Sequence, residues 1–392
     1  MRDYTFRFSE TSSTTLNLIR VVAIHNIVIV HGMAMTQINR SINFGLIGSL
    51  TFPFLFLISG FLISHSVFSK MEQKSYDFRK FFINRVSRII PPLFVGLTLT
   101  ALIDGMWGIS MGIEIPSETY NIPTFFLNIL LLNNSAFGVP SFGSSFQLWT
   151  LPMFFWAYLF FGWILLGLKS TKKRYFYFIL LGFFTFMMIM IYCGPWYRGS
   201  FKGDISLFFT WICGVFFSIL MNQMNYSVQK KKNPSNIEVN NINSHNNLLR
   251  DQFNNKKLLP IIKSKLFLWG SLFFISFFLI GPIFDIQLVE YILLLISAFF
   301  CLLIYTQYTS YSYPKRFKKI LSFMASYSYS IYIIHYSIFN FLSLFFGDVN
   351  NILLFLLGYI ICNLLSIGIA SITERRYHTI SAFLLKKLNL KD

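Results

Sequence analysis

Residues 16–32 read LNLIRVVAIHNIVIVHG, an apolar run that contains only a few polar side chains. With its neighbours it predicts a helix over 15–36, long enough to cross the roughly 30 Å hydrocarbon core of a bilayer. Similar runs recur along all 392 residues, so the first one is expected to be a membrane helix rather than a cleaved signal peptide. The pattern predicts an all-α, polytopic integral membrane protein.

The composition supports this fold class. Hydrophobic residues make up 55% of the chain and charged residues 12%, which is too little polar surface for a soluble protein of this length. The spans are expected to form one transmembrane domain over residues 1–392. About ten are predicted, at 15–36, 44–64, 89–103, 146–168, 175–193, 204–222, 266–283, 288–308, 323–345 and 351–372.

The distribution of basic residues indicates topology. The formal net charge is +18, and 29 of the 33 Lys and Arg residues fall in the tails and loops of one side. The other side receives three, and Arg20 lies within the first span. Because cytoplasmic loops collect Lys and Arg, both termini are predicted to be cytoplasmic. The basic loops then serve as topology signals that contact membrane lipids, and binding of nucleic acid is not expected.

Two segments do not fit simple spans. Residues 104–145 contain an apolar stretch too short to cross, which predicts an outer loop with a re-entrant or interfacial helix. Residues 224–257 are rich in Asn and Lys and predict a disordered cytoplasmic insertion. The four cysteines lack metal-ligand spacing, and no nucleotide-binding glycine motif is present, so neither a metal site nor ATP-driven transport is expected.

The first span carries polar side chains whose placement in the hydrocarbon core costs free energy, among them Arg20 and His31. A separation of eleven residues is three helical turns, so both side chains project from one face, about 16 Å apart along the axis. That arrangement suits an elongated ligand, with a guanidinium on a phosphate and an imidazole acting as a base further in. Alternatively, Arg20 reaches lipid headgroups and His31 is a packing residue.

Other polar groups lie on later spans. Ser59 and Gly60 favour a close helix approach or a local break in the second span. Arg85 and Arg88 share a helical face at the inner surface, where they can bind either a phosphate ligand or lipid headgroups.

The ninth span places Ser328, Tyr332 and His335 on one face, which predicts either the lining of a hydrated cavity or a hydrogen-bonded helix contact. At the end of the last span, Glu374 precedes Arg375 and Arg376, where a structural ion pair is expected.

Taken in order, these segments resemble acyltransferase family 3, a family of membrane acyltransferases, over nearly the whole chain. The first span resembles the family's opening helix with Arg and His. The other matching segments are FLFLISGFLIS at 54–64, RVSRIIPP at 85–92, QLWTLPMFFWAYLFFG at 147–162 with Trp149 in its Leu-Trp-x-Leu motif, SYSIYIIHYS at 328–337 and ITERRYH at 372–378. An acidic pair that many members carry after Leu-Trp-x-Leu is absent, because Pro152, Met153, Phe154 and Phe155 stand there.

The resemblance implies transfer of an acyl group, usually acetyl, from cytoplasmic acyl-coenzyme A to a sugar hydroxyl of a cell-surface polysaccharide or lipid-linked saccharide. Acyl-coenzyme A is then a co-substrate, no permanently bound cofactor is expected, and the location is a bacterial inner or plasma membrane. Arg20, Arg85 and Arg88 would bind the coenzyme A phosphates. His31 would act as the base or carry the acyl group, with His335 as a second catalytic histidine.

In the same scheme Ser328, Tyr332, Ser59 and Trp149 would line the substrate cavity. Two alternatives remain from the sequence: a secondary transporter or flippase for a lipid-linked glycan, and a glycan polymerase. A carrier would be built from two related halves, and no similarity between halves is evident in the sequence. The sequence specifies neither the acceptor nor the acyl chain nor the oligomeric state.

Overall fold

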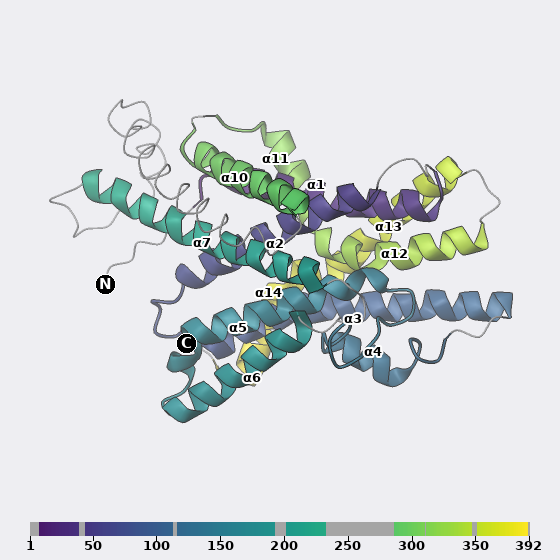
Figure 1. The fold of residues 1–392 in the computed structure, drawn as a ribbon, viewed down its shortest axis with the longest axis horizontal. Helices are drawn as coiled ribbons and strands as arrows, with labels where there is room; N and C mark the ends of the chain where they lie inside the picture. Colours follow the sequence, from purple (N-terminus) through teal and green to yellow (C-terminus); the bar gives the residue numbers. More distant parts are fainter. Residues whose placement is uncertain are drawn as a thin grey trace. The chain divides into compact units, whose positions relative to one another are not determined.

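A computed structural model describes residues 8–38, 44–112, 116–192, 201–232, 286–309, 311–346 and 351–390, and every regular element within these ranges is a helix (Figure 1). Fourteen helical elements are described, of which η1 and η4 are 3-10 helices. They are α1 (Glu10–Met35), α2 (Phe44–Phe68), α3 (Phe78–Met111), α4 (Ile122–Ile129), η1 (Phe146–Trp149), α5 (Thr150–Ser170), α6 (Arg174–Tyr192), α7 (Phe201–Lys232), α10 (Ile286–Tyr308), α11 (Lys315–Ala325), α12 (Ser328–Phe345), α13 (Asn351–Ile372), η4 (Glu374–Arg376) and α14 (Tyr377–Lys387).

Seven helical stretches among the described residues are long and apolar enough to cross a bilayer, which confirms an all-helical protein with several membrane spans. They are Glu10–Met35, Thr51–Phe68, Phe78–Met111, Phe146–Ser170, Arg174–Tyr192, Ile205–Met224 and Asn351–Lys387. Of the other three predicted spans, 266–283 lies outside the described residues, and 288–308 corresponds to α10. The span at 323–345 is interrupted, because α11 ends at Ala325 and α12 begins at Ser328.

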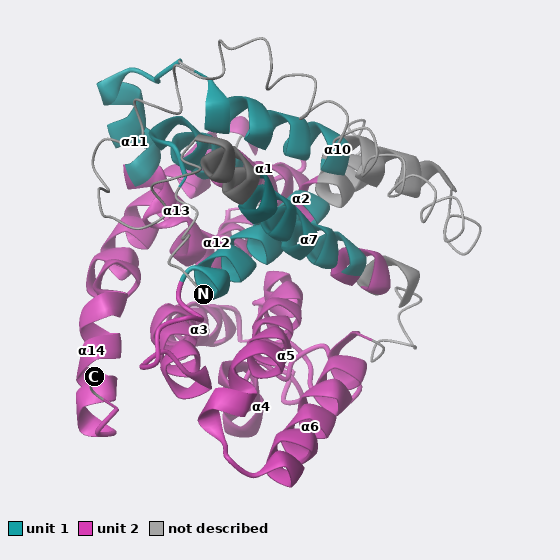
Figure 2. Cartoon of the chain, turned by 90° about the vertical axis from the view of Figure 1, so that its left-hand side faces the viewer, with its two compact units in different colours: residues 1–19, 53–69, 209–322 teal, residues 20–52, 70–208, 323–392 magenta. Residues whose placement is uncertain are grey.

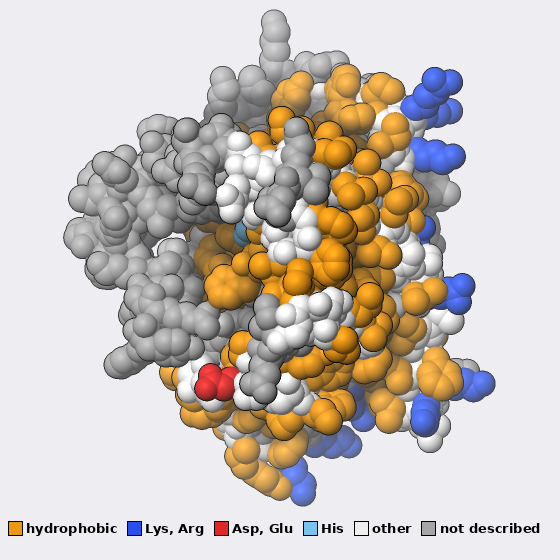
Figure 3. Space-filling view, turned by 90° about the vertical axis from the view of Figure 1, so that its right-hand side faces the viewer, with side chains coloured by type: hydrophobic (Ala, Val, Ile, Leu, Met, Phe, Trp, Pro, Cys, Tyr) orange, Lys and Arg blue, Asp and Glu red, His pale blue; other side chains and the backbone are white. Residues whose placement is uncertain are grey.

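Apolar side chains cover the outside of the spans. Ile109 on α3 is 86% exposed and Leu364 on α13 is 64% exposed, although both lie on apolar helices. Figure 3 shows hydrophobic side chains over much of the described surface in that view, with Lys and Arg gathered towards its margin. Apolar surface of this extent is expected on the parts of a protein that face lipid.

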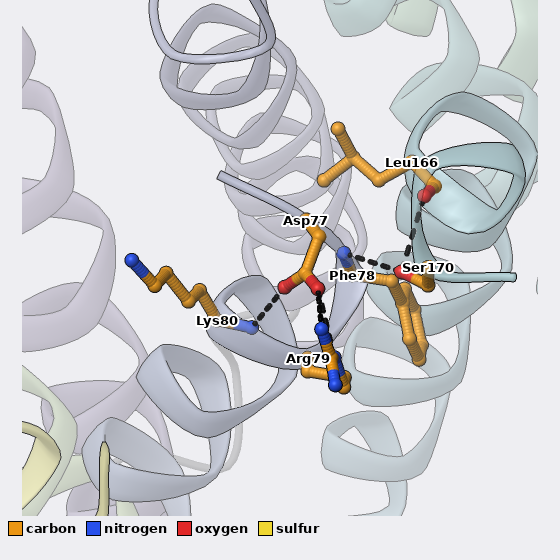
Figure 4. A network of polar contacts seen from close by, with 6 residues as sticks. All are labelled: Asp77, Phe78, Arg79, Lys80, Leu166 and Ser170. Atoms are coloured by element: carbon orange, nitrogen blue, oxygen red, sulfur yellow. Dashed lines mark hydrogen bonds and ion pairs between the residues drawn. The ribbon is translucent and has the colours of Figure 1, made fainter. Parts of the chain in front are cut away.

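Helix α3 begins eleven residues before the predicted span at 89–103. Asp77 caps it, since its Oδ1 accepts a hydrogen bond from the Lys80 backbone N–H at 3.1 Å and its Oδ2 accepts one from Arg79 Nε at 2.8 Å (Figure 4). Ser170 Oγ, at the end of α5, accepts a bond from the Phe78 N–H at 2.9 Å. An aspartate cap satisfies one of the free N–H groups of the first turn, so the basic segment that follows can be helical.

The structure also corrects the predicted bounds of two segments. Residues 104–111, expected in an outer loop, continue α3, and the short apolar stretch that follows forms helix α4. Asp104 on α3 accepts bonds at 2.7 Å from both the backbone N–H and the hydroxyl of Ser144, which hold the chain just before η1. The first nine residues of the expected insertion at 224–257 belong to α7, and residues 233–257 lie outside the described residues.

The chain forms two compact units (Figure 2). Unit 1 comprises residues 1–19, 53–69 and 209–322, and unit 2 comprises residues 20–52, 70–208 and 323–392. Helices α1, α2, α7 and α11 each contribute residues to both units.

Unit 1 has an apolar core in which Phe61 on α2 packs against Phe299 on α10, with ring centroids 6.0 Å apart. A Cβ added at Gly60 would overlap the backbone carbonyl of Trp211 on α7, so this glycine permits the close approach expected from the sequence. Helix α2 is continuous through this position, and no local break occurs there.

In unit 2, α12 packs against α3, α13 and η1, and α5 packs against α6. Glycines on three neighbouring helices bring α12 close. A Cβ at Gly32 on α1 would lie 2.5 Å from the Phe339 ring, one at Gly358 on α13 would lie 2.6 Å from the same ring, and one at Gly96 on α3 would overlap Ile333. Small residues therefore surround the helix that carries His335.

Replacement of Gly60 by Ala should destabilise the protein by about 1–3 kcal/mol, because the added methyl group meets backbone atoms that cannot rotate away. The measurement is the thermal unfolding midpoint in detergent. The matched control is Gly182→Ala on α6, where a Cβ has no heavy atom within 4 Å. An equal drop in both variants, or none in the Gly60 variant, would contradict the close approach.

Candidate functional site

Arg20 and His31 both reach the segment that contains the end of α11 and the start of α12. Arg20 Nη2 donates to the backbone carbonyl of Ala325 at 3.1 Å. His31 Nδ1 lies 2.9 Å from Nε2 of His335. Since Ala325 and His335 lie ten positions apart in the same segment, the two side chains on α1 project from one face, as the spacing of eleven residues predicts.

The two histidines form a hydrogen-bonded pair between α1 and α12. Their ring planes are within 6° of parallel, and the ring centroids are 5.2 Å apart. His335 is completely buried at 0% exposure, whereas His31 is only partly buried. Of the pair, His31 is therefore the histidine that a bound substrate can contact.

The surroundings of His335 determine where the hydrogens lie. Its Nδ1 is 2.9 Å from the carbonyl oxygen of Tyr332 and 3.1 Å from that of Ile331, and carbonyl oxygens only accept. Nδ1 must therefore carry the hydrogen, and a buried ring without a carboxylate partner stays neutral. The bare Nε2 of His335 accepts from His31 Nδ1–H, so the remaining ring nitrogen of His31, Nε2, carries a lone pair.

Aromatic rings flank the accessible imidazole. The ring of Tyr336 meets the His31 ring edge to face at a centroid distance of 5.5 Å, and the Phe146 ring lies 6.1 Å from Tyr336. Phe146 is 51% exposed at the start of η1. A partly buried imidazole beside aromatic rings is an environment of low polarity, in which a base competes with little water.

The element η1 is joined to α12 by hydrogen bonds. Gln147 is buried. Its side-chain amide donates to the backbone carbonyl of Ile333, and its backbone carbonyl accepts from the Tyr332 hydroxyl. Thr150 Oγ1 lies 2.6 Å from the same hydroxyl. Trp149 is partly buried and packs on Phe52 of α2, with ring centroids 5.3 Å apart. These bonds fix the position of η1 along α12.

Ser328 and Tyr332, which the sequence assigns to the substrate cavity or to a helix contact, are both buried. They are 3% and 4% exposed. Ser328 Oγ donates to the Met324 carbonyl within its own segment, and the Tyr332 hydroxyl is held by η1. Both hydroxyls are therefore hydrogen-bonded to protein groups.

Arg85 and Arg88 lie on α3 and are both partly buried. The guanidinium of Arg85 sits over the Phe81 ring at 5.4 Å, and that of Arg88 over the Tyr377 ring at the same distance. Arg88 is close enough to interact electrostatically with both Arg85 and Arg20. The three arginines that the sequence assigns to phosphate binding thus belong to one electrostatic cluster in unit 2.

Lys70 adds a fourth cation to this cluster. Burial lowers the pKa of its ammonium group below the usual value, and the positive charge of Arg85 lowers the pKa further. Its Nζ lies over the Tyr76 ring at 5.8 Å. Burial also raises the pKa of Tyr76, an effect that the charge of Arg85 opposes. Like charges gathered in this way repel one another and are stabilised by a bound anion.

The carboxylate of Glu374, for which the sequence predicts a structural ion pair, lies within electrostatic reach of the cluster. Its Oε2 accepts from the backbone N–H of Ser330 at 3.2 Å and from the Ser330 hydroxyl at 3.0 Å. Arg375 turns elsewhere, with Nε donating to Ser326 Oγ at 3.0 Å. Glu374 interacts electrostatically with Arg88 and Arg20 instead, and it anchors the first turn of α12.

Two other polar residues that the sequence singles out, His25 and Ser59, have different surroundings. His25 points to α13, where its Nδ1 is 2.8 Å from the Tyr359 hydroxyl, so it does not share the face of Arg20 and His31. Ser59 belongs to unit 1 and is partly buried on α2.

Sequence reasoning missed Lys70, Gln147 and Tyr336. Lys70 was counted among the basic topology signals, and nothing in its loop distinguishes it from its neighbours. Gln147 directly precedes the Leu-Trp-x-Leu motif, and Tyr336 directly follows His335, so proximity to the motifs was the available signal.

One comparison with known proteins gives a match. The family model described as an acyltransferase domain, that of acyltransferase family 3, matches residues 14–371, nearly the whole chain. No curated protein and no solved structure matches the chain.

The histidine pair should show a defined pattern of ring protons. In protein labelled with ¹⁵N-histidine, His31 and His335 should both be neutral at pH 7, with hydrogen on Nδ1 and a bare Nε2, because two carbonyls fix the hydrogen of His335. Solid-state ¹⁵N NMR measures this, with His31→Gln and His335→Gln variants to assign the signals. Hydrogen on Nε2 of His335 would contradict the arrangement, and the exposed His378 serves as the reference.

Proposed function

The chain belongs to acyltransferase family 3, and on that premise we propose that this multi-pass membrane protein is an O-acyltransferase. The acyl group, usually acetyl, passes from acyl-coenzyme A to a sugar hydroxyl of a cell-surface polysaccharide or lipid-linked saccharide. Acyl-coenzyme A is a co-substrate, and the protein works in a bacterial inner or plasma membrane. The family match and the apolar helices support the coarse assignment.

The observation that carries the proposed reaction is the bare Nε2 of His31 at a partly exposed position, held by the buried His335. His31 Nε2 takes the proton of the acceptor hydroxyl as the oxygen attacks the thioester carbonyl carbon. The carbon–sulfur bond then breaks, and the thiolate of coenzyme A takes up the proton from His31. Atoms and charge balance without a further reactant.

In this reaction His335 is a positioning residue, because it has no exposed surface through which to touch a substrate. It keeps His31 in the tautomer with hydrogen on Nδ1 and stabilises the imidazolium that forms during the transfer. The same geometry also serves a covalent route in which His31 Nε2 accepts the acyl group first and then passes it to the hydroxyl.

On the donor side, Arg20, Arg85 and Arg88 bind the phosphates of coenzyme A, with Lys70 at the edge of the cluster. A guanidinium matches phosphate oxygens with two parallel donors, and three arginines provide several such contacts. The excess of basic residues in these loops favours a cytoplasmic position for the cluster, where acyl-coenzyme A is made.

Replacement of His31 by Gln should lower the rate of acetyl transfer by about 100- to 10,000-fold, because glutamine keeps hydrogen-bonding capacity but cannot take the proton. Transfer of radiolabelled acetyl from acetyl-coenzyme A to membrane glycan measures the rate, and acetyl-coenzyme A binding should persist. The control is His25→Gln on the same helix, which faces α13 and should retain most activity. Near-normal turnover in the His31 variant would overturn the assignment.

Arg85→Ala and Arg88→Ala should each weaken acetyl-coenzyme A binding by roughly 10- to 100-fold, the cost of one charge-assisted contact. Calorimetry on purified protein measures the affinity. Arg79→Ala is the matched control, because Arg79 lies on the same helix but is exposed and pairs with Asp77 at 2.7 Å. If both cluster variants bind as tightly as the Arg79 variant, the pair contacts lipid headgroups instead.

A further inference from the structure

Helix α11, Lys315–Ala325, is amphipathic. At 100° per residue, its exposed basic residues Lys315, Arg316 and Lys319 fall within an arc of about 100°. Five of the six apolar residues fall within an arc of about 140° on the other side, namely Phe317, Ile320, Leu321, Met324 and Ala325, whereas Phe323 lies within the basic arc.

Only part of the apolar arc is used for packing. Leu321 and Ala325 are 4% exposed, whereas Ile320 is 57% exposed and Phe317 is 36% exposed. The exposed apolar side chains of Phe317 and Ile320 therefore lie between the buried face of the helix and the basic arc. A helix packed by one edge with an open apolar flank and a basic face has the composition of an interfacial membrane helix.

The position of α11 in the chain favours a place at a membrane surface. It connects α10 with α12, which occupy the predicted spans at 288–308 and 323–345, so the connection is expected near the level of the headgroups. Just before it stand Tyr311, 54% exposed, and Tyr313, whose ring lies 5.5 Å from that of Phe317. Tyrosines are enriched at the level of the lipid headgroups.

Both ends of α11 are held in place. Near its start, Lys318 Nζ pairs with Glu10 at 2.5 Å, so this lysine is already neutralised. At its end, the Ala325 carbonyl accepts from Arg20, and the Arg375 guanidinium lies over the Phe323 ring at 4.9 Å. The remaining three basic side chains have no carboxylate partner within the described part of the chain, and they are presented by a fixed helix.

We propose that α11 is a binding site for anionic phospholipid headgroups, with Lys315, Arg316 and Lys319 on the phosphates and Phe317 and Ile320 inserted between the acyl chains. Charge complementarity selects the ligand, because zwitterionic lipids offer these side chains no net negative charge. Each basic residue near an anionic surface contributes roughly a fivefold gain in affinity. The site is independent of acyl transfer.

The test is native mass spectrometry of delipidated protein titrated with phosphatidylglycerol or phosphatidylcholine. The unmodified chain should prefer phosphatidylglycerol, and the triple variant Lys315→Gln, Arg316→Gln, Lys319→Gln should lose between about 10- and 100-fold in phosphatidylglycerol affinity. The matched control is the triple variant Lys172→Gln, Lys173→Gln, Arg174→Gln, which removes three exposed charges from the end of the α5–α6 loop and the first residue of α6. The control should lose much less.

A second measurement locates the lipid. Hydrogen exchange of the peptide that covers α11 should slow in nanodiscs that contain phosphatidylglycerol relative to nanodiscs of phosphatidylcholine alone, and the triple variant should lose that difference. Equal losses in both triple variants, no lipid preference in the unmodified chain, or unchanged exchange in α11 would each overturn the proposal. Neither readout uses acyl-coenzyme A, so a failure of the proposed reaction would be seen separately.

Discussion

The hydrogen bond from His31 to His335 is the contact on which the candidate site depends. A buried imidazole that loses its partner is left with an unsatisfied polar group, which costs about 1–3 kcal/mol or more in a medium without water. The bond requires α1 and α12 to lie close together. Gly32, the next residue after His31, allows this because the Phe339 ring of α12 occupies the space that a side chain would fill. Packing and hydrogen bonding are therefore set by adjacent residues on α1 and by residues one turn apart on α12.

The same requirement for partners explains how α12 is held along its length. Near its start Ser330 donates to Glu374, in the middle the Tyr332 hydroxyl binds η1, and further on Ser337 Oγ lies 2.9 Å from Thr100 Oγ1 of α3. These three side chains thus link α12 to η4, η1 and α3 of unit 2. The helix has few ways to rotate or slide without breaking several of these bonds, so the position of His335 is determined before any substrate binds.

Much of this arrangement was accessible from the sequence, because helix periodicity is local. The separation of Arg20 and His31 predicts that they share a face, and their partners Ala325 and His335 agree with it. The pairing of His31 with His335 was not predictable, since the two lie 304 positions apart and nothing local specifies which helix packs where. The start of α3 was missed although Asp77 is a capping residue, because the basic segment after it is not apolar enough to be recognised as part of a span.

Glu374 shows why proximity in sequence misleads at helix ends. The sequence predicts a structural ion pair for it, and Arg375 and Arg376 are the nearest cations along the chain. However, the 3-10 turn directs successive side chains about 120° apart, and Glu374 alone turns into the protein. There it lies near Arg20 and Arg88, and a single carboxylate among several cations leaves a net positive charge. Such a surplus is what the proposed phosphate site requires, whereas the charges of a structural ion-pair network balance. In the proposed reaction, phosphate at this cluster and the thioester near His31 would both lie along one face of α1, so that one helix would position both ends of an elongated donor.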